Sequence, residues 1–208
     1  MRFISRHLST ALIVPVILSA VSCNKKAIEG KRAEAAANEV AAANQLTFRN
    51  DARQLYNNRD FAGLEALAKK IRENKSRFVD GQWAIEDFYS SQDCRKDEPE
   101  SMWQLHDQIH RDWLKKYPDS ITARVAHANF LITYAWHARS DRRGSQVTQV
   151  GWDLFRERLA EARTVLDKSK ELKPVCPMMY SSYQTIALGQ GWPRAEYDAL
   201  FKEAKSLE

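Results

Sequence analysis

Apolar residues recur at helical spacing from Phe48 to the end of the chain. Within 61–71 one face collects Phe61, Leu64, Leu67, Ala68 and Ile71. Asp60, directly before this segment, is a typical N-cap residue. Proline and glycine stops divide the rest of the chain into further helices, at about 101–117, 120–138, 148–172, 178–189 and 193–207. No segment has the regular alternation of a strand, so the pattern predicts an all-α domain.

One short stretch allows a second interpretation. Asp80 and Gly81 form a turn signal, and a hairpin could cross them. The arm that follows lacks clean alternation, and we expect its large side chains to be buried, at Trp83, Ile85, Phe88 and Tyr89.

The segment 120–138 combines small and aromatic residues on one arc, Ala123, Ala126, Phe130, Tyr134 and Ala138. Small residues beside large ones let antiparallel helices pack closely. Short helices joined by tight turns are typical of tetratricopeptide-like stacks, in which helix pairs build an α-α superhelix. No clean 34-residue repeat is present, so we expect an irregular stack of antiparallel helix pairs.

The first residues have a different pattern. Arg2 and Arg6 precede an apolar run of about 13 residues that ends in Ala20-Val21-Ser22-Cys23, which is the layout of a secretory signal. A membrane-spanning helix needs roughly 20 residues, and Pro15 interrupts this run. With Cys23 at the cleavage point, the segment resembles a bacterial lipoprotein signal; plain secretion and an uncleaved anchor are the alternatives.

This resemblance implies three segments: a signal peptide at 1–22, a lipidated Cys23 with an alanine-rich tether to residue 47, and a helical domain at 48–208. It also implies a diacylglyceryl group on the Cys23 thiol and a further acyl chain, such as palmitate, on the new amino terminus. Several acyl chains hold a protein firmly at a membrane. Asn24 in place of aspartate points to the outer membrane, with the domain facing the periplasm or the cell surface.

Charge adds little to this picture. The chain has 32 basic and 27 acidic residues, a formal charge of +5. Loss of Arg2 and Arg6 with the signal would lower it to +3. Basic and acidic residues alternate, as expected for solvated helix faces, and no nucleic-acid partner is expected.

Of the three cysteines, lipidation would use Cys23 and leave Cys94 and Cys176. In an oxidising compartment an even remainder favours a disulfide between them. The bridge would close a loop of about 80 residues and contribute roughly 4 kcal/mol. Two separate thiols are the alternative.

The segment "HDQIH", residues 106–110, is the sharpest candidate for chemistry. His106 and His110 lie one turn apart and could bind one metal ion, with Asp107 where zinc peptidases have a glutamate base. Both histidines also fall on the arc of the packing face, Met102, Leu105, Ile109, Trp113 and Tyr117. No third ligand follows at a known spacing, so we expect structural histidines and no metal or other cofactor. His127 and His137 could extend them to a four-histidine cluster.

Several strings carry a family resemblance: "FAGLEALAKKIRE", "RFVDGQWAIEDFY", "WLKKYPDSITARVAHANF", "YAWHAR", "FRERLAEAR", "CPMMY" and "GWPRAEYDALFKEAK". Over about residues 55–208 the chain resembles a bacterial domain-of-unknown-function family, the one numbered 4034. The resemblance carries no catalytic motif. It implies that the family stack continues past Glu208, so that this chain would lack its last helices.

These observations favour a non-enzymatic, lipid-anchored helical module that binds another protein or a peptide in the cell envelope, as a binding or scaffold domain. Some of the tryptophans and tyrosines could line a concave recognition groove, because aromatic residues are enriched at binding hot spots. The alternative is a metal-dependent hydrolase built on His106, Asp107 and His110.

Overall fold

The computed structural model describes residues 44–173 and 175–206. Residues 44–57 form one helix. The later elements are α2 (Phe61–Asn74), α3 (Ala84–Ser90), α4 (Glu100–Lys116), α5 (Ile121–Arg139), η1 (Gly144–Gln146), α6 (Gln149–Asp167), α7 (Pro177–Gln190) and α8 (Arg194–Lys205). Among these residues there is no strand, only an isolated bridge between Arg77 and Trp83. The all-α prediction is therefore confirmed.

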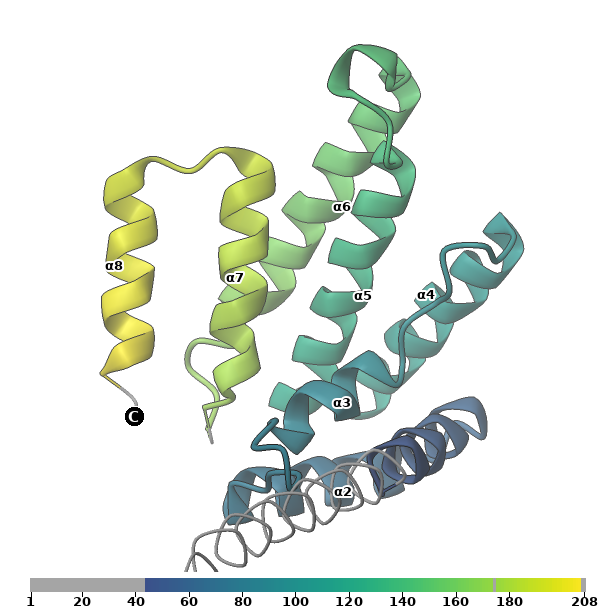
Figure 1. Cartoon of the computed structure of the whole chain (residues 1–208), viewed down its shortest axis with the longest axis vertical. Coiled ribbons are helices and arrows are strands. Elements are labelled where there is room, and N and C mark those ends of the chain that lie inside the picture. Colours follow the sequence, from purple (N-terminus) through teal and green to yellow (C-terminus); the bar gives the residue numbers. More distant parts are fainter. Residues whose placement is uncertain (1–43, 174, 207–208) are drawn as a thin grey trace, which may run out of the picture. The chain divides into compact units, whose positions relative to one another are not determined.

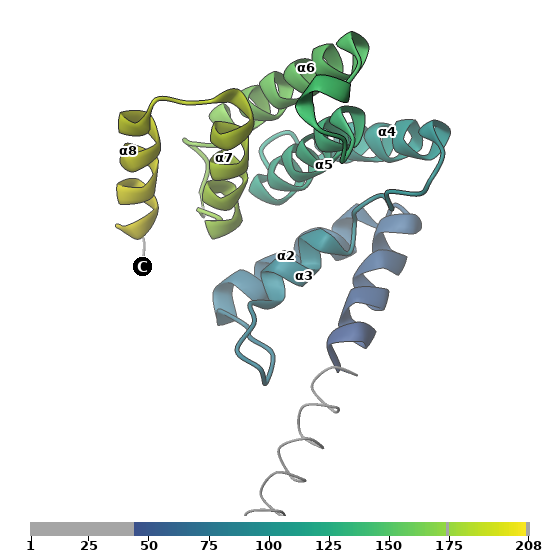
Figure 2. The same cartoon turned by 45° about the horizontal axis from the view of Figure 1, so that its top comes forward.

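Consecutive helices from α4 onward alternate in direction and form neighbouring pairs (Figure 1). Helix α5 is central, since it packs on α4, α6 and α7. In stacked helix pairs, each helix packs both on the other helix of its own pair and on the neighbouring pair. The contacts of α5 follow this pattern. In both views α8 lies beside α7 at an edge of the stack (Figure 2).

The central position of α5 follows from its composition. Most of its residues are buried, including the small Ala123, Ala126, Ala128 and Ala135. A helix that is apolar on most sides must be covered on most sides. The first turn of α6 approaches the last turn of α5 very closely. A Cβ atom on Gly151 of α6 would lie 2.8 Å from the carbonyl oxygen of Ala138 of α5. The sequence expectation of close packing through small residues is met here.

Local hydrogen bonds fix where the helices begin. The Asp60 carboxylate accepts from the Gly63 backbone N–H at 2.9 Å, which confirms the predicted N-cap of α2. Ser120 and Thr148 cap α5 and α6 in the same way. Helix α6 ends at Asp167, five residues before its predicted end at 172. Near this end the Ser169 hydroxyl donates to the carbonyl of Val165, a local bond that competes with the helical pattern.

The Asp80-Gly81 signal gives a tight turn. Gly81 has a φ of +88°, a conformation that favours glycine, and its N–H donates to Phe78. The turn brings Arg77 opposite Trp83, and the guanidinium carbon lies 3.6 Å from the indole centroid. The chain then enters α3 instead of a second strand, so the hairpin is limited to one bridge.

The predicted boundary between tether and domain lies between residues 47 and 48. The helix over 44–57 runs across it, and the compact unit spans Asn44–Glu208. The signal segment, Cys23 and most of the predicted tether lie outside the described residues. Within the described part of the chain, no helix combines the length and the apolar character needed to cross a membrane.

Candidate functional site

The histidines of the "HDQIH" segment face the interior, as predicted, but Asp107 faces a different set of partners. His106 and His110 are buried on α4. Asp107 accepts from Arg111 Nε at 2.8 Å and lies 3.4 Å from His127 Nε2. Burial alone would raise the pKa of Asp107, but the hydrogen bonds from His127 and Arg111 hold it below its ordinary value. The base expected of a hydrolase is therefore engaged in an ion pair with Arg111 and in a contact with His127.

His106 is held by residues of the first described helix. Its Nδ1 lies 3.1 Å from the Tyr56 hydroxyl, and its Nε2 lies 3.5 Å from a guanidinium nitrogen of Arg53. The other terminal nitrogen of Arg53 donates to the carbonyls of Ser91 and Asp93, at 3.1 and 2.7 Å. Burial, and then the Arg53 charge, lowers the pKa of His106. The ring is therefore neutral at pH 7, the form that can bind a metal ion.

His110 is a neutral aromatic packing residue. Only 1% of it is exposed, and its ring stacks on Phe130 and His127 with centroid distances of 5.0 and 6.1 Å. Among the described residues neither ring nitrogen has a hydrogen-bond partner. Burial, followed by the nearby His127, His106 and Arg53, lowers its pKa well below the ordinary value.

The four-histidine cluster does not form as a unit. His127 reaches His110 and Asp107, whereas His137 stacks on Trp103 with a centroid distance of 4.2 Å. All four histidines thus take part in ring contacts, and His106 also has polar contacts with Tyr56 and Arg53.

The disulfide between Cys94 and Cys176 is a prediction that the structure corrects. Both are buried, free thiols. The Cys94 sulfur lies 3.7 Å from Glu98 Oε2, and the Cys176 sulfur lies 3.5 Å from the Tyr89 hydroxyl. Each thiol has a polar partner of its own: Glu98 in the loop before α4 is the partner of Cys94, and Tyr89 on α3 is the partner of Cys176, the N-cap of α7.

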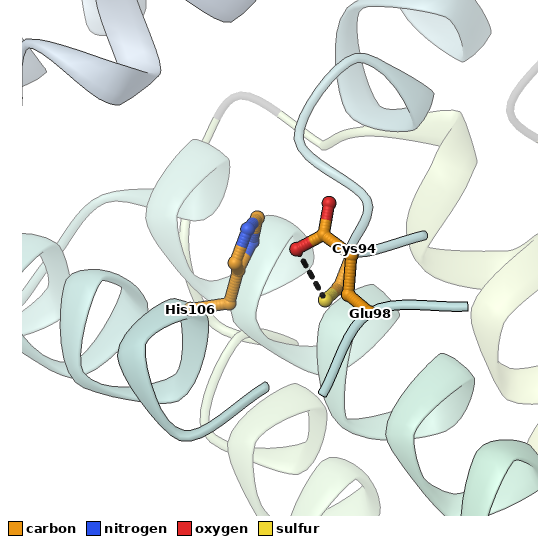
Figure 3. A group of neighbouring side chains, drawn as sticks. All are labelled: Cys94, Glu98 and His106. Atoms are coloured by element: carbon orange, nitrogen blue, oxygen red, sulfur yellow. Dashed lines mark hydrogen bonds between the residues drawn. The ribbon is translucent and has the colours of Figure 1, made fainter. Parts of the chain in front are cut away.

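The structure instead brings Cys94 together with Glu98 and His106 (Figure 3). One potential ligand atom from each residue lies within 4.8 Å of the other two. Cys94 and Glu98 come from the loop before α4, and His106 comes from the second turn of that helix. Burial, then the Glu98 carboxylate, raises the pKa of the Cys94 thiol to about 12. Sequence reasoning missed this group, although the Cys-x₃-Glu-x₇-His spacing is visible in the sequence.

A second feature is a groove of about 490 Å³ between α7 and α8, called here the α7–α8 groove. Its lining is Ser181, Gln184, Thr185, Ala187, Leu188, Gly191, Trp192, Arg194 and Tyr197. Leu188 is 74% exposed. Phe201, one turn after Tyr197 on α8, is 54% exposed. Two aromatic side chains, Trp192 and Tyr197, are thus part of the groove lining.

Comparison with known proteins gives no identification, since no family model, no curated protein and no solved structure matches this chain.

Proposed function

We propose that this protein is a lipid-anchored, non-enzymatic module of the bacterial cell envelope, and that its α7–α8 groove binds an amphipathic helix of another envelope protein or peptide. The observation that carries the proposal is the exposed Leu188 in the groove lining, together with Phe201, which is exposed one turn beyond the lining residue Tyr197. Large apolar side chains exposed along one surface are typical of interaction sites.

The chemistry of the groove indicates what kind of partner it binds. The lining combines apolar side chains, Leu188 and Trp192, with polar ones, Ser181, Gln184 and Thr185. A helix with one apolar face and polar flanks matches this lining. Stacked helix pairs bury their apolar faces against a neighbouring helix, so an incoming helix would continue the packing pattern of the stack.

The anchor part of the proposal rests on the sequence around Cys23 and on the resemblance to lipoprotein signals. Outer-membrane placement rests on Asn24. The resemblance to the domain-of-unknown-function family 4034 fits an envelope protein without a catalytic motif. The hydrolase alternative is less well supported, because Asp107 is paired with Arg111 and His127.

Site-specific photocrosslinking tests the binding surface. A photoreactive residue is placed at Leu188 or at Phe201 in the full chain in intact cells, and at the control positions Val79 and Val150, which are also more than half exposed. We expect positions 188 and 201 to capture the same protein or peptide, and the controls to capture none of it. Crosslinks to that partner from all four positions, or from none, would refute the groove as the binding surface.

A further inference from the structure

The loop before α4 is fixed against the first described helix. Arg53 donates from one terminal nitrogen to the backbone carbonyls of Ser91 and Asp93. These bonds hold the segment that leads into Cys94 against the helix over 44–57. A thiol that is only 4% exposed is thereby positioned next to a buried imidazole. Ligands held by the surrounding structure are the requirement for a metal site with a defined geometry.

The three donor types belong together in one class of site. A thiolate, an imidazole and a carboxylate are all ligands that zinc takes in proteins, and three protein ligands with one open position form a common arrangement. Two ligands of one tetrahedral zinc ion lie about 3.3 to 3.8 Å apart, given zinc–ligand distances of about 2.0 to 2.3 Å. The Cys94–Glu98 separation of 3.7 Å is already in this range. The other ligand atoms are at most 4.8 Å apart, so a contraction of at most about 1 to 1.5 Å would close the site, and half-buried Glu98 on its loop can supply part of it.

The surroundings of His106 match those of a metal ligand. Ligating histidines are oriented by a partner on the second ring nitrogen. Tyr56 has this position, with its hydroxyl 3.1 Å from Nδ1, and it also approaches the His106 carbonyl at 3.5 Å. Nε2 is the nitrogen offered to the metal, because its 3.5 Å separation from Arg53 is at the limit of a hydrogen bond. The Gln92 backbone is a further hydrogen-bond partner of the ring. Two anionic ligands would offset the positive charge of Arg53.

We propose that Cys94, Glu98 and His106 bind one divalent transition-metal ion, with zinc as the expected occupant. The site differs from the "HDQIH" arrangement, since it uses His106 without His110 or Asp107. It is also independent of the α7–α8 groove. On binding, the Cys94 thiol releases its proton to solvent and coordinates as a thiolate.

Cobalt titration of the purified full chain, freed of metal by a chelator and reduced, tests the site directly. We expect saturation at about one equivalent, with the near-ultraviolet charge-transfer absorption of a cobalt–thiolate bond, and reversal of this absorption by added zinc. Absence of that absorption in the wild-type protein would overturn the proposal, whatever the variants do.

Variants then assign the ligands. Cys94→Ser should abolish the charge-transfer absorption and weaken binding more than about 100-fold, whereas the matched control Cys176→Ser should change neither. His106→Gln is compared with His137→Gln in the same way. Tyr56→Phe should weaken binding about 10-fold, the lower range for loss of a group that orients a ligand. An unchanged cobalt spectrum in Cys94→Ser would refute the assignment, and so would equal losses of cobalt affinity in a ligand variant and its matched control. Circular dichroism verifies that each variant is folded.

Discussion

Glu65 joins three helices through one carboxylate oxygen, and its replacement gives a sharp test of the packing. Oε1 of Glu65 accepts from the Trp113 indole N–H at 2.9 Å and from the Ser120 hydroxyl. Glu65 lies on α2, Trp113 on α4, and Ser120 is the N-cap of α5. The Trp113 ring is fully buried and stacks on Phe61 with a centroid distance of 5.7 Å. The carboxylate therefore satisfies a donor that water cannot reach.

Glu65→Leu removes this acceptor. A buried donor left without a partner costs about 1–3 kcal/mol, and loss of the charge-assisted bond from half-buried Ser120 adds a smaller amount. We expect the free energy of unfolding to fall by about 2–4 kcal/mol. In a domain of this size each kcal/mol lowers Tm by roughly 2–4 °C, so a loss of about 3 kcal/mol lowers it by about 6–12 °C.

The matched control is Glu65→Gln, which keeps a side-chain oxygen at nearly the same position. It should cost only about 0.5–1.5 kcal/mol, the net value of an ordinary hydrogen bond. Urea unfolding followed by far-ultraviolet circular dichroism and tryptophan fluorescence measures both variants. If Glu65→Leu is no less stable than Glu65→Gln, the bridging role of Glu65 is wrong.

Three further predictions concern titration, thiols and the anchor. Burial holds the folded-state pKa of His110 well below the unfolded value of about 6.5. The free energy of unfolding is therefore full above pH 6.5 and falls on acidification by up to about 1.4 kcal/mol per pH unit. Urea unfolding of His110→Phe should show a shallower loss of stability between pH 6.5 and 5, and an unchanged slope would contradict this. Because Cys94 and Cys176 are buried and free, thiol labelling with chelator but without reductant should be slow at both in the native protein and complete at both in denaturant. If neither thiol is labelled in denaturant, the disulfide prediction is right after all. Cys23→Ser should move the protein out of the detergent phase of Triton X-114, and a mature peptide starting at unmodified Cys23 would refute lipidation.

The sequence predicted the helices well because their information is local. Spacing of apolar residues, the capping residue Asp60 and the proline stops all act within one or two turns. The α4 face was predicted less accurately: Leu105 was expected to pack, but it is 42% exposed, and Trp103 is fully buried instead. Contacts of Trp103 with Tyr134 and His137 of α5 determine the buried face, and these depend on how the two helices cross.

The sites were harder to predict because they depend on long-range contacts. Cys94 and Glu98 lie in a loop without periodicity, and its position is fixed by Arg53, about 40 residues earlier. The number of cysteines indicated a disulfide, but it contains no information about distance. Cys176 instead faces Tyr89.

The central claim is that the α7–α8 groove binds a partner, and the affinity of groove variants for the crosslinked partner tests it most directly. Burying Leu188 and Phe201, which are 74% and 54% exposed, should together contribute about 2–4 kcal/mol to binding. The Leu188→Asp, Phe201→Asp double variant should therefore raise Kd by about 30-fold or more, and Val150→Asp, at a position 67% exposed, should leave it unchanged. An unchanged Kd in the folded double variant, or an equal increase in Val150→Asp, would contradict the account.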